Sequence, residues 1–220
     1  MSFETEAQIE IRELHAALGL CGRLFGPSDR RTLFAVHALA MAQFGSGDVE
    51  GAERLLHDTL DRLTPSLGKE HPSCVDLLHT LGHIALAEGG TETAARIFRE
   101  VLECDIRYSG PNHPSSIEAR GDLAGVLFEL GQDEEAESLE IEACEGASQH
   151  LGCNHPITTT LGWNRVISLE RRGRIDAANL VIAEYLSWLL TEEPSRLEPG
   201  QNTIRSLVAE RLHWSTAPLC

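Results

Sequence analysis

The sequence predicts an all-α fold, an α-solenoid in which about four helical hairpins follow one another with an extra helix at each end. Three observations support this prediction. A His-Pro pair recurs every 42 residues, beginning at His71, His113 and His155. Two series of glycines keep the same interval and lie half a period apart, and small and apolar residues between them recur in step. Repetition at a fixed period is typical of solenoids, whose units bury their apolar faces against one another.

The glycines and the His-Pro pairs predict where each helix ends and the next begins. Glycine takes the left-handed conformation that ends a helix, and proline has its φ preset for a first helical turn. A residue before proline is disfavoured in the α region, so we expect each histidine at a helix entrance, where its imidazole can accept from a free backbone N–H. These histidines are therefore interpreted as structural. The two glycine series are Gly26, Gly68, Gly110 and Gly152, and Gly47, Gly89, Gly131 and Gly173.

A polar residue follows each glycine of the second series, and these residues are candidate N-caps for the second helix of each hairpin. They are Asp48, Thr91, Asp133 and Asp176. Beyond each cap, an alanine recurs with a larger apolar residue three positions later, as expected of a buried helix face. The alanines are Ala52, Ala94, Ala136 and Ala178.

These signals divide the chain into expected elements within one elongated domain, residues 1–220. The hairpins are expected at about 29–66, 71–108, 113–150 and 155–190, with a lone helix at about 4–22 and a closing helix at about 200–214.

The segment 79–102, HTLGHIALAEGGTETAARIFREVL, resembles a tetratricopeptide repeat (TPR). Leu81, Gly82, Ala94 and Phe98 have the spacing of the TPR signature, and the longer period and LGxxHP linker are similar to the variant of kinesin light chains. The resemblance implies a non-enzymatic interaction module, an adaptor, scaffold or regulator. Such a module binds a protein or peptide segment in a concave groove lined by the first helix of each hairpin.

The resemblance also implies which residues line that groove. The expected partner-binding residues are Phe34, His37, Phe44, Asp76, His79, His83, Asp122, Phe128, Trp163, Asn164 and Arg205. Kinesin-light-chain-like repeats carry an asparagine at the position of Asn164 that holds the backbone of an extended peptide, whereas Ala38, Thr80 and Asp122 stand there in the other hairpins. We therefore expect a specialised ligand or a weaker groove. The aromatic residues either anchor apolar side chains of a partner or pack inward as core.

A second interpretation is an enzyme or small-ligand sensor with a site built from His37, His79, His83 and Asp122. His79 and His83 have the i, i+4 spacing at which two imidazoles reach one metal ion. No glutamate base or HExxH motif accompanies them, and the sequence has no phosphate-binding loop, nucleophile elbow or dinucleotide fingerprint. We therefore predict no catalytic residue, no metal and no cofactor.

Charge and composition indicate which class of partner and which cellular compartment to expect. The chain has 18 Lys and Arg against 34 Asp and Glu, a net charge of −16, which argues against nucleic acid and anionic membranes and favours a neutral to basic protein partner. Solubility alone would also account for the acidity. No long apolar run or signal peptide is recognisable, so we expect a cytoplasmic protein. The six cysteines have no CxxC spacing and are expected as free thiols. The oligomeric state is left open.

Overall fold

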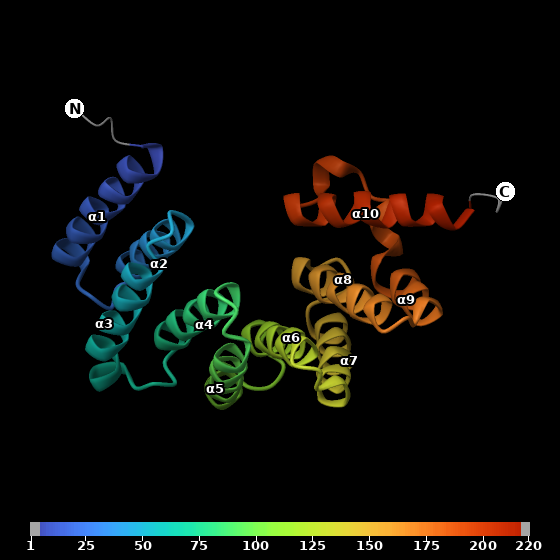
Figure 1. The fold of residues 1–220 in the computed structure, drawn as a ribbon, viewed down its shortest axis with the longest axis horizontal. Helices are drawn as coiled ribbons and strands as arrows, with labels where there is room; N and C mark the ends of the chain where they lie inside the picture. Colours follow the sequence, from blue (N-terminus) through green and yellow to red (C-terminus); the bar gives the residue numbers. More distant parts are fainter. Residues whose placement is uncertain (1–4, 217–220) are drawn as a thin grey trace. The chain divides into compact units, whose positions relative to one another are not determined.

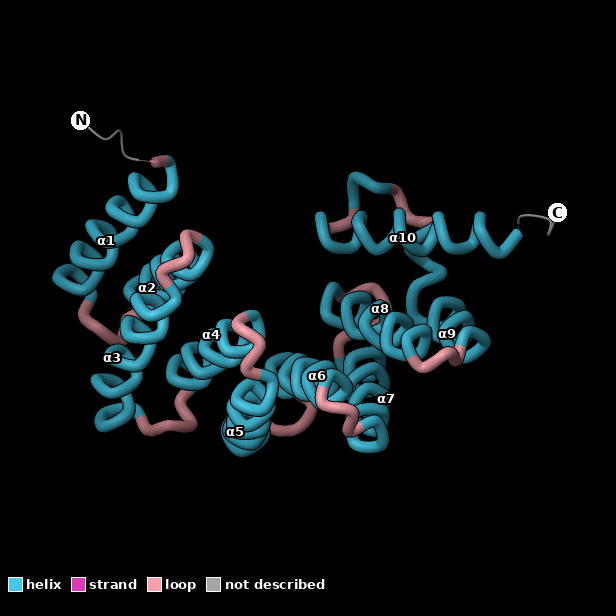
Figure 2. Tube along the Cα trace, viewed as in Figure 1, coloured by secondary structure: helices cyan, strands magenta, loops and turns pink. Residues whose placement is uncertain are grey.

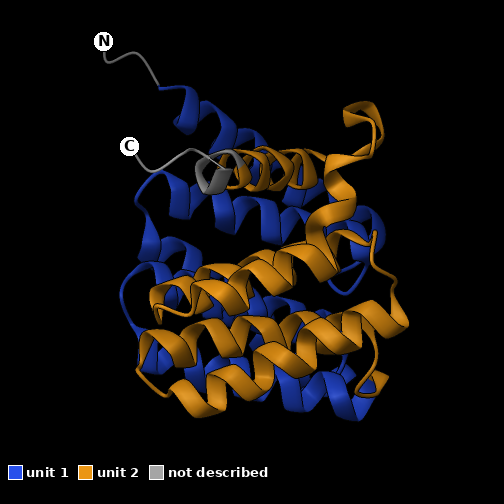
Figure 3. Ribbon diagram, turned by 90° about the vertical axis from the view of Figure 1, so that its right-hand side faces the viewer, with its two compact units in different colours: residues 1–108 blue, residues 109–220 orange. Residues whose placement is uncertain are grey.

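A computed structural model describes residues 5–216 and is all-α within that range, with ten α-helices and no strand (Figures 1 and 2). The predicted fold class is confirmed. The first residue of the expected lone helix, Glu4, and the last cysteine, Cys220, lie outside the described residues. The chain divides into two compact units, residues 1–108 and 109–220 (Figure 3).

The first unit contains the expected lone helix and two hairpins. Helix α1 packs on α2, and α2 packs on both α3 and α4. The lone helix extends three residues beyond its expected end. The bounds are α1 (Glu6–Phe25), α2 (Arg30–Gly45), α3 (Val49–Leu67), α4 (Pro72–Ala87) and α5 (Thr91–Ser109).

The second unit contains the other two hairpins and the closing helix. Helix α8 packs against α6, α7 and α9, and α10 lies against α8. The bounds are α6 (Pro114–Glu129), α7 (Asp133–His150), α8 (Pro156–Arg171), α9 (Ile175–Val181) and α10 (Pro199–Thr216).

The predicted glycines do end the helices. All eight have a positive φ and lie within two residues of a helix end. Gly68 differs from the expected left-handed helical conformation, because its φ of 86° is combined with an extended ψ of 152°. This combination is open essentially to glycine alone, and it leads the chain directly away from α3 into the linker.

The histidines of the His-Pro pairs are N-caps, as predicted. The Nδ1 atom of His71 accepts from the backbone N–H of Ser73 at 3.2 Å. His113 and His155 make the same contact at the starts of α6 and α8. Each histidine thus satisfies one of the N–H groups that a helix start leaves without a partner.

The predicted caps of the second helices are correct at one position. Asp48 caps α3, and its carboxylate accepts from the backbone N–H of Gly51 at 3.0 Å. At the other three positions the prediction is wrong, because Thr91, Asp133 and Asp176 lie in the first turns of α5, α7 and α9. These helices begin one or two residues earlier than expected. The two aspartates then face the positive end of a helix dipole instead of capping it.

The second helix of the last hairpin is not continuous to residue 190. Helix α9 ends at Val181, and a π-helical turn (Ile182–Leu186), a 3₁₀ turn (Ser187–Leu190) and a further 3₁₀ turn (Pro194–Arg196) follow before α10. Side chains satisfy carbonyl groups of this irregular segment. Trp188 Nε1 donates to the carbonyl of Tyr185 at 3.1 Å, and Arg205 Nε donates to that of Leu189 at 3.0 Å.

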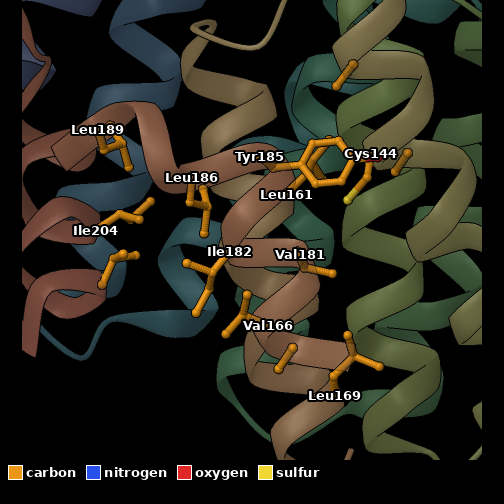
Figure 4. Packing of buried hydrophobic residues seen from close by; sticks show 14 of the residues in the cluster. Cys144, Leu161, Val166, Leu169, Val181, Ile182, Tyr185, Leu186, Leu189 and Ile204 are labelled. Atoms are coloured by element: carbon orange, nitrogen blue, oxygen red, sulfur yellow. The ribbon is translucent and has the colours of Figure 1, made fainter. Parts of the chain in front are cut away.

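Each unit has its own apolar core. The alanines predicted at the repeat period are all fully buried. In the second unit, Leu161 and Val166 of α8 gather with Ile182 and Leu186 in a single cluster (Figure 4). None of the helices described has the length and hydropathy that a membrane span requires.

Thiol reactivity offers a direct test of this burial. Cys74, Cys104 and Cys144 are buried free thiols, whereas Cys153 is exposed. Burial raises the pKa of all three buried thiols, that of Cys144 to about 12, and the thiolate is the reactive form. We expect iodoacetamide to alkylate Cys153 in the folded chain and the buried cysteines only after unfolding, as measured by peptide mass spectrometry. Alkylation of Cys144 as fast as Cys153 would contradict the packing described.

Candidate partner-binding surface

A hollow of about 320 Å³ lies between α2 and α4, the first helices of the first two hairpins. Four of the predicted groove residues line it, two from each helix: Phe34 and His37, and Asp76 and His79. Their spacing along each helix is three residues, so each pair shares one helix face. The helical periodicity used in the sequence analysis therefore places these four side chains around a common space.

Phe34 borders this hollow and a second one, and Arg30 lines both as well. The second hollow, of about 440 Å³, lies between α1 and α2 and has mostly apolar walls, including Leu14, Ala17, Ala35 and Ala38. Phe34 lines both and is 73% exposed. A large exposed aromatic ring thus borders one hollow with mixed polar and apolar walls and one with apolar walls.

Thr80, at the position of the peptide-holding asparagine, is engaged within the protein. Its side chain is buried, and its hydroxyl donates to the backbone carbonyl of Asp76 at 2.9 Å. His37 Nδ1 lies 3.1 Å from the same oxygen. Because a hydroxyl has one proton, Thr80 must accept from His37 Nδ1–H. Thr80 has no further proton to offer a peptide backbone.

Asp76 is exposed on the wall of the hollow, and its carboxylate is partly removed from water. In the described part of the chain, no hydrogen bond or ion pair reaches the carboxylate oxygens. Desolvation raises the pKa of Asp76, and the nearby charges of His79, His37, Arg30 and His71 act in the opposite direction. The carboxylate is therefore a hydrogen-bond acceptor on the wall of the hollow, with Arg30 and three histidines near it.

His79 and His83 lie against a buried aromatic ring. The centroids of the two imidazole rings are 4.5 Å apart. They lie 5.6 Å (His79) and 5.1 Å (His83) from the centroid of the Phe98 ring, and both pairs have a T-shaped geometry. His79 lines the hollow between α2 and α4, whereas His83 is exposed farther along α4. The enzymatic interpretation used four residues. His37, His79 and His83 belong to the first unit, and Asp122 is half-buried on α6 of the second.

The second unit has a smaller hollow of about 160 Å³ between α6 and α8. Phe128 and Asn164 line it together with Arg171. The guanidinium carbons of Arg171 and Arg172 lie 4.7 and 4.6 Å from the centroid of the Phe128 ring, so this ring already has cation–π partners. Asn164 is exposed at the rim.

Three other predicted groove residues contact the protein's own core or backbone. Phe44 and Trp163 are half-buried and pack against the cores of the first and second unit. Arg205 holds the carbonyl of Leu189. Truncating any of the three would therefore reduce stability as well as any partner contact.

The sequence analysis did not single out Arg30 and Ser73, which also line the hollow between α2 and α4. Arg30 lies one helical turn before Phe34, and Ser73 lies three residues before Asp76. Extending the i, i+3 and i+4 pattern by one turn toward each helix start would have found both.

Comparison with known proteins identifies the family. The family profile described as tetratricopeptide repeat matches residues 31–107 and 76–149, which together cover more than half of the chain. The chain therefore belongs to the tetratricopeptide repeat family. No curated protein sequence matches it.

Solved structures share the fold. BtubC (BKLC) from P. vanneervenii is similar with a TM-score of 0.80 and 16% identity, over 99% of this chain and 95% of that one. Two structures of a candidate kinesin light chain of Podosopora anserina, built from nearly identical TPR-like repeats, have TM-scores of 0.67 and 0.66 at 20% identity. They cover 84% and 86% of this chain and 88% and 90% of theirs. The fold is thus of the kinesin-light-chain-like TPR type, as predicted.

Proposed function

We propose that this chain is a non-enzymatic, cytoplasmic interaction module, an adaptor, scaffold or regulator, that binds a segment of another protein along the first helices of its hairpins. The observation that carries the proposal is the exposed ring of Phe34 between the two hollows of the first unit. Aromatic side chains that become desolvated in a pocket supply most of the energy of an interface. Membership of the TPR family, which is generally non-enzymatic, supports the same function.

The charge of the chain supports the class of partner. With a net charge of −16, the protein favours neutral or basic segments and disfavours nucleic acid and anionic membranes. Long-range attraction of this kind mainly accelerates association, whereas buried contacts around Phe34 would determine the lifetime of the complex.

Selection from a displayed library of random peptides tests the proposal. We expect the full chain to enrich peptides that bind with micromolar affinity, roughly −8 kcal/mol by calorimetry. Phe34→Ala should weaken binding by about tenfold or more, because it removes the exposed anchor. Leu180→Ala is the matched control, since Leu180 is 71% exposed on α9 and lines neither hollow.

The result that would overturn the proposal is equally specific. Either no peptide is enriched, or the enriched peptides bind the Phe34→Ala and Leu180→Ala variants equally well. Binding that maps to Glu134 and Glu142 of the acidic helix α7 would instead indicate a scaffold that uses its second helices.

A further inference from the structure

We propose that Asp76 receives a lysine or arginine side chain of the bound segment, while the apolar hollow on the other side of Phe34 receives a large apolar side chain next to it. The inference rests on the proposed function and specifies its partner. The predicted ligand is thus a protein segment that pairs a bulky apolar residue with a basic one.

The apolar half of this site is formed by small side chains. Ala17, Ala35 and Ala38 leave the space between α1 and α2 open. Leu14 and Cys21 also line it, together with the side chains of Arg30 and Arg31. The hollow of about 440 Å³ is bordered by the exposed Phe34 ring. An aromatic or long aliphatic side chain would remove both the ring and these walls from water, which is the favourable term in such contacts.

The basic half of the site follows from the state of the Asp76 carboxylate. The Asp76 side chain is exposed on the wall of the hollow, and none of the described residues donates a hydrogen bond to its carboxylate. Partial burial raises the pKa of this carboxyl group. The charged or titratable groups that face it are Arg30 and His37 from α2, and His71 and His79 from the start and middle of α4. A cationic side chain would supply the charge-assisted hydrogen bond that these groups do not make.

The walls beside Asp76 suit the stem of such a side chain. Leu33 of α2 and Leu77 of α4 line the same hollow. Lysine and arginine place their methylene groups along apolar surface while their charged end reaches a polar partner. Phe34 borders both hollows, so the apolar and basic residues of the ligand would lie on either side of its ring.

The test compares peptide selections on the wild-type chain and on variants of Asp76. The wild type should enrich peptides in which lysine or arginine lies close to an aromatic or aliphatic residue. Asp76→Asn should keep the apolar preference and lose the basic one, and Asp76→Lys should enrich acidic residues at the same place. Asp61→Asn is the control, because Asp61 is exposed on α3 and lines neither hollow.

Calorimetry with two synthetic peptides then isolates the contact. The probes are the strongest wild-type binder and the same peptide with its basic residue replaced by norleucine. Asp76→Asn should weaken the basic peptide by about tenfold and leave the norleucine peptide unchanged. Circular dichroism of each variant verifies that the fold is retained.

The possible outcomes separate the two proposals. If Phe34-dependent binding is found, but the selected peptides lack basic residues or Asp76→Asn weakens both probes equally, the role of Asp76 is refuted and the proposed function stands. If no Phe34-dependent binding is found, the proposed function fails and this inference fails with it.

Discussion

Replacing Glu140 by alanine is expected to lower the free energy of unfolding of the second unit by about 3–5 kcal/mol. Glu140 lies on α7 and is only 8% exposed. Its carboxylate accepts from the hydroxyl of Ser168 at 2.5 Å and from Arg172 Nη1 at 3.0 Å. The residue therefore joins α7 to the end of α8 by a buried ion pair.

The expected loss is large because Arg172 would keep its charge and lose its main acceptor. Its Nε and Nη2 atoms already have no hydrogen-bond partner among the described residues. Asp133 lies 3.5 Å from Nε, and the Phe128 ring lies nearby, so some compensation would remain. Leaving one partner of a buried pair uncompensated costs more than the pair contributes when it is intact.

Chemical denaturation and hydrogen exchange of the α7 and α8 amides measure this effect. Glu145→Ala is the matched control, since Glu145 is exposed on the same helix, and it should change stability by no more than about 0.5 kcal/mol. Replacing both Glu140 and Arg172 by leucine should recover much of the loss, because no unpaired charge then remains. A Glu140→Ala variant as stable as Glu145→Ala would contradict the buried pair.

The helix breaks could be predicted from sequence because their causes are local. A glycine with positive φ and a histidine before proline act within two or three residues of their own position, as Gly89 and His71 do. The break after Val181 has no such signal. The carbonyl of Leu189 in the irregular segment that follows accepts from Arg205, which belongs to a helix that begins at Pro199. Contacts of this range cannot be inferred from spacing along one helix.

In the candidate site, too, local periodicity could be predicted from the sequence, whereas contacts with distant residues could not. Helical periodicity brought Phe34, His37, Asp76 and His79 to facing positions. It did not distinguish Phe34, which is exposed, from Phe44, which lies ten residues later on the same helix and packs on the core. That difference depends on which neighbouring helix covers each turn. Burial of Glu140 against Ser168, 28 residues away, was likewise invisible in the repeat pattern.

Gly89→Val and Ala94→Leu should together cost about 2–5 kcal/mol of stability, through two different mechanisms. Gly89 has a φ of 80°, and no atom lies within 4 Å of the position that a Cβ would occupy. Its replacement by a β-branched residue is therefore disfavoured by backbone strain rather than by collision. Ala94 is fully buried on α5, so leucine there would overfill a packed core.

Matched substitutions separate these mechanisms from general effects of larger side chains. Gly45→Val adds the same side chain at a helical glycine with open space around it, and Ala87→Leu adds leucine at an exposed position of α4. Both controls should melt close to the wild-type temperature.

The two destabilising changes should also be felt beyond their own hairpin. In a repeat array, each unit is stabilised mainly by the interface with its neighbour, so strain at the turn between α4 and α5 weakens the support of α2 and α3. Hydrogen exchange should therefore accelerate in the α2–α3 hairpin as well as in α4 and α5. If both variants retain the wild-type melting temperature, the positive φ at Gly89 and the close packing at Ala94 are not what holds these helices together.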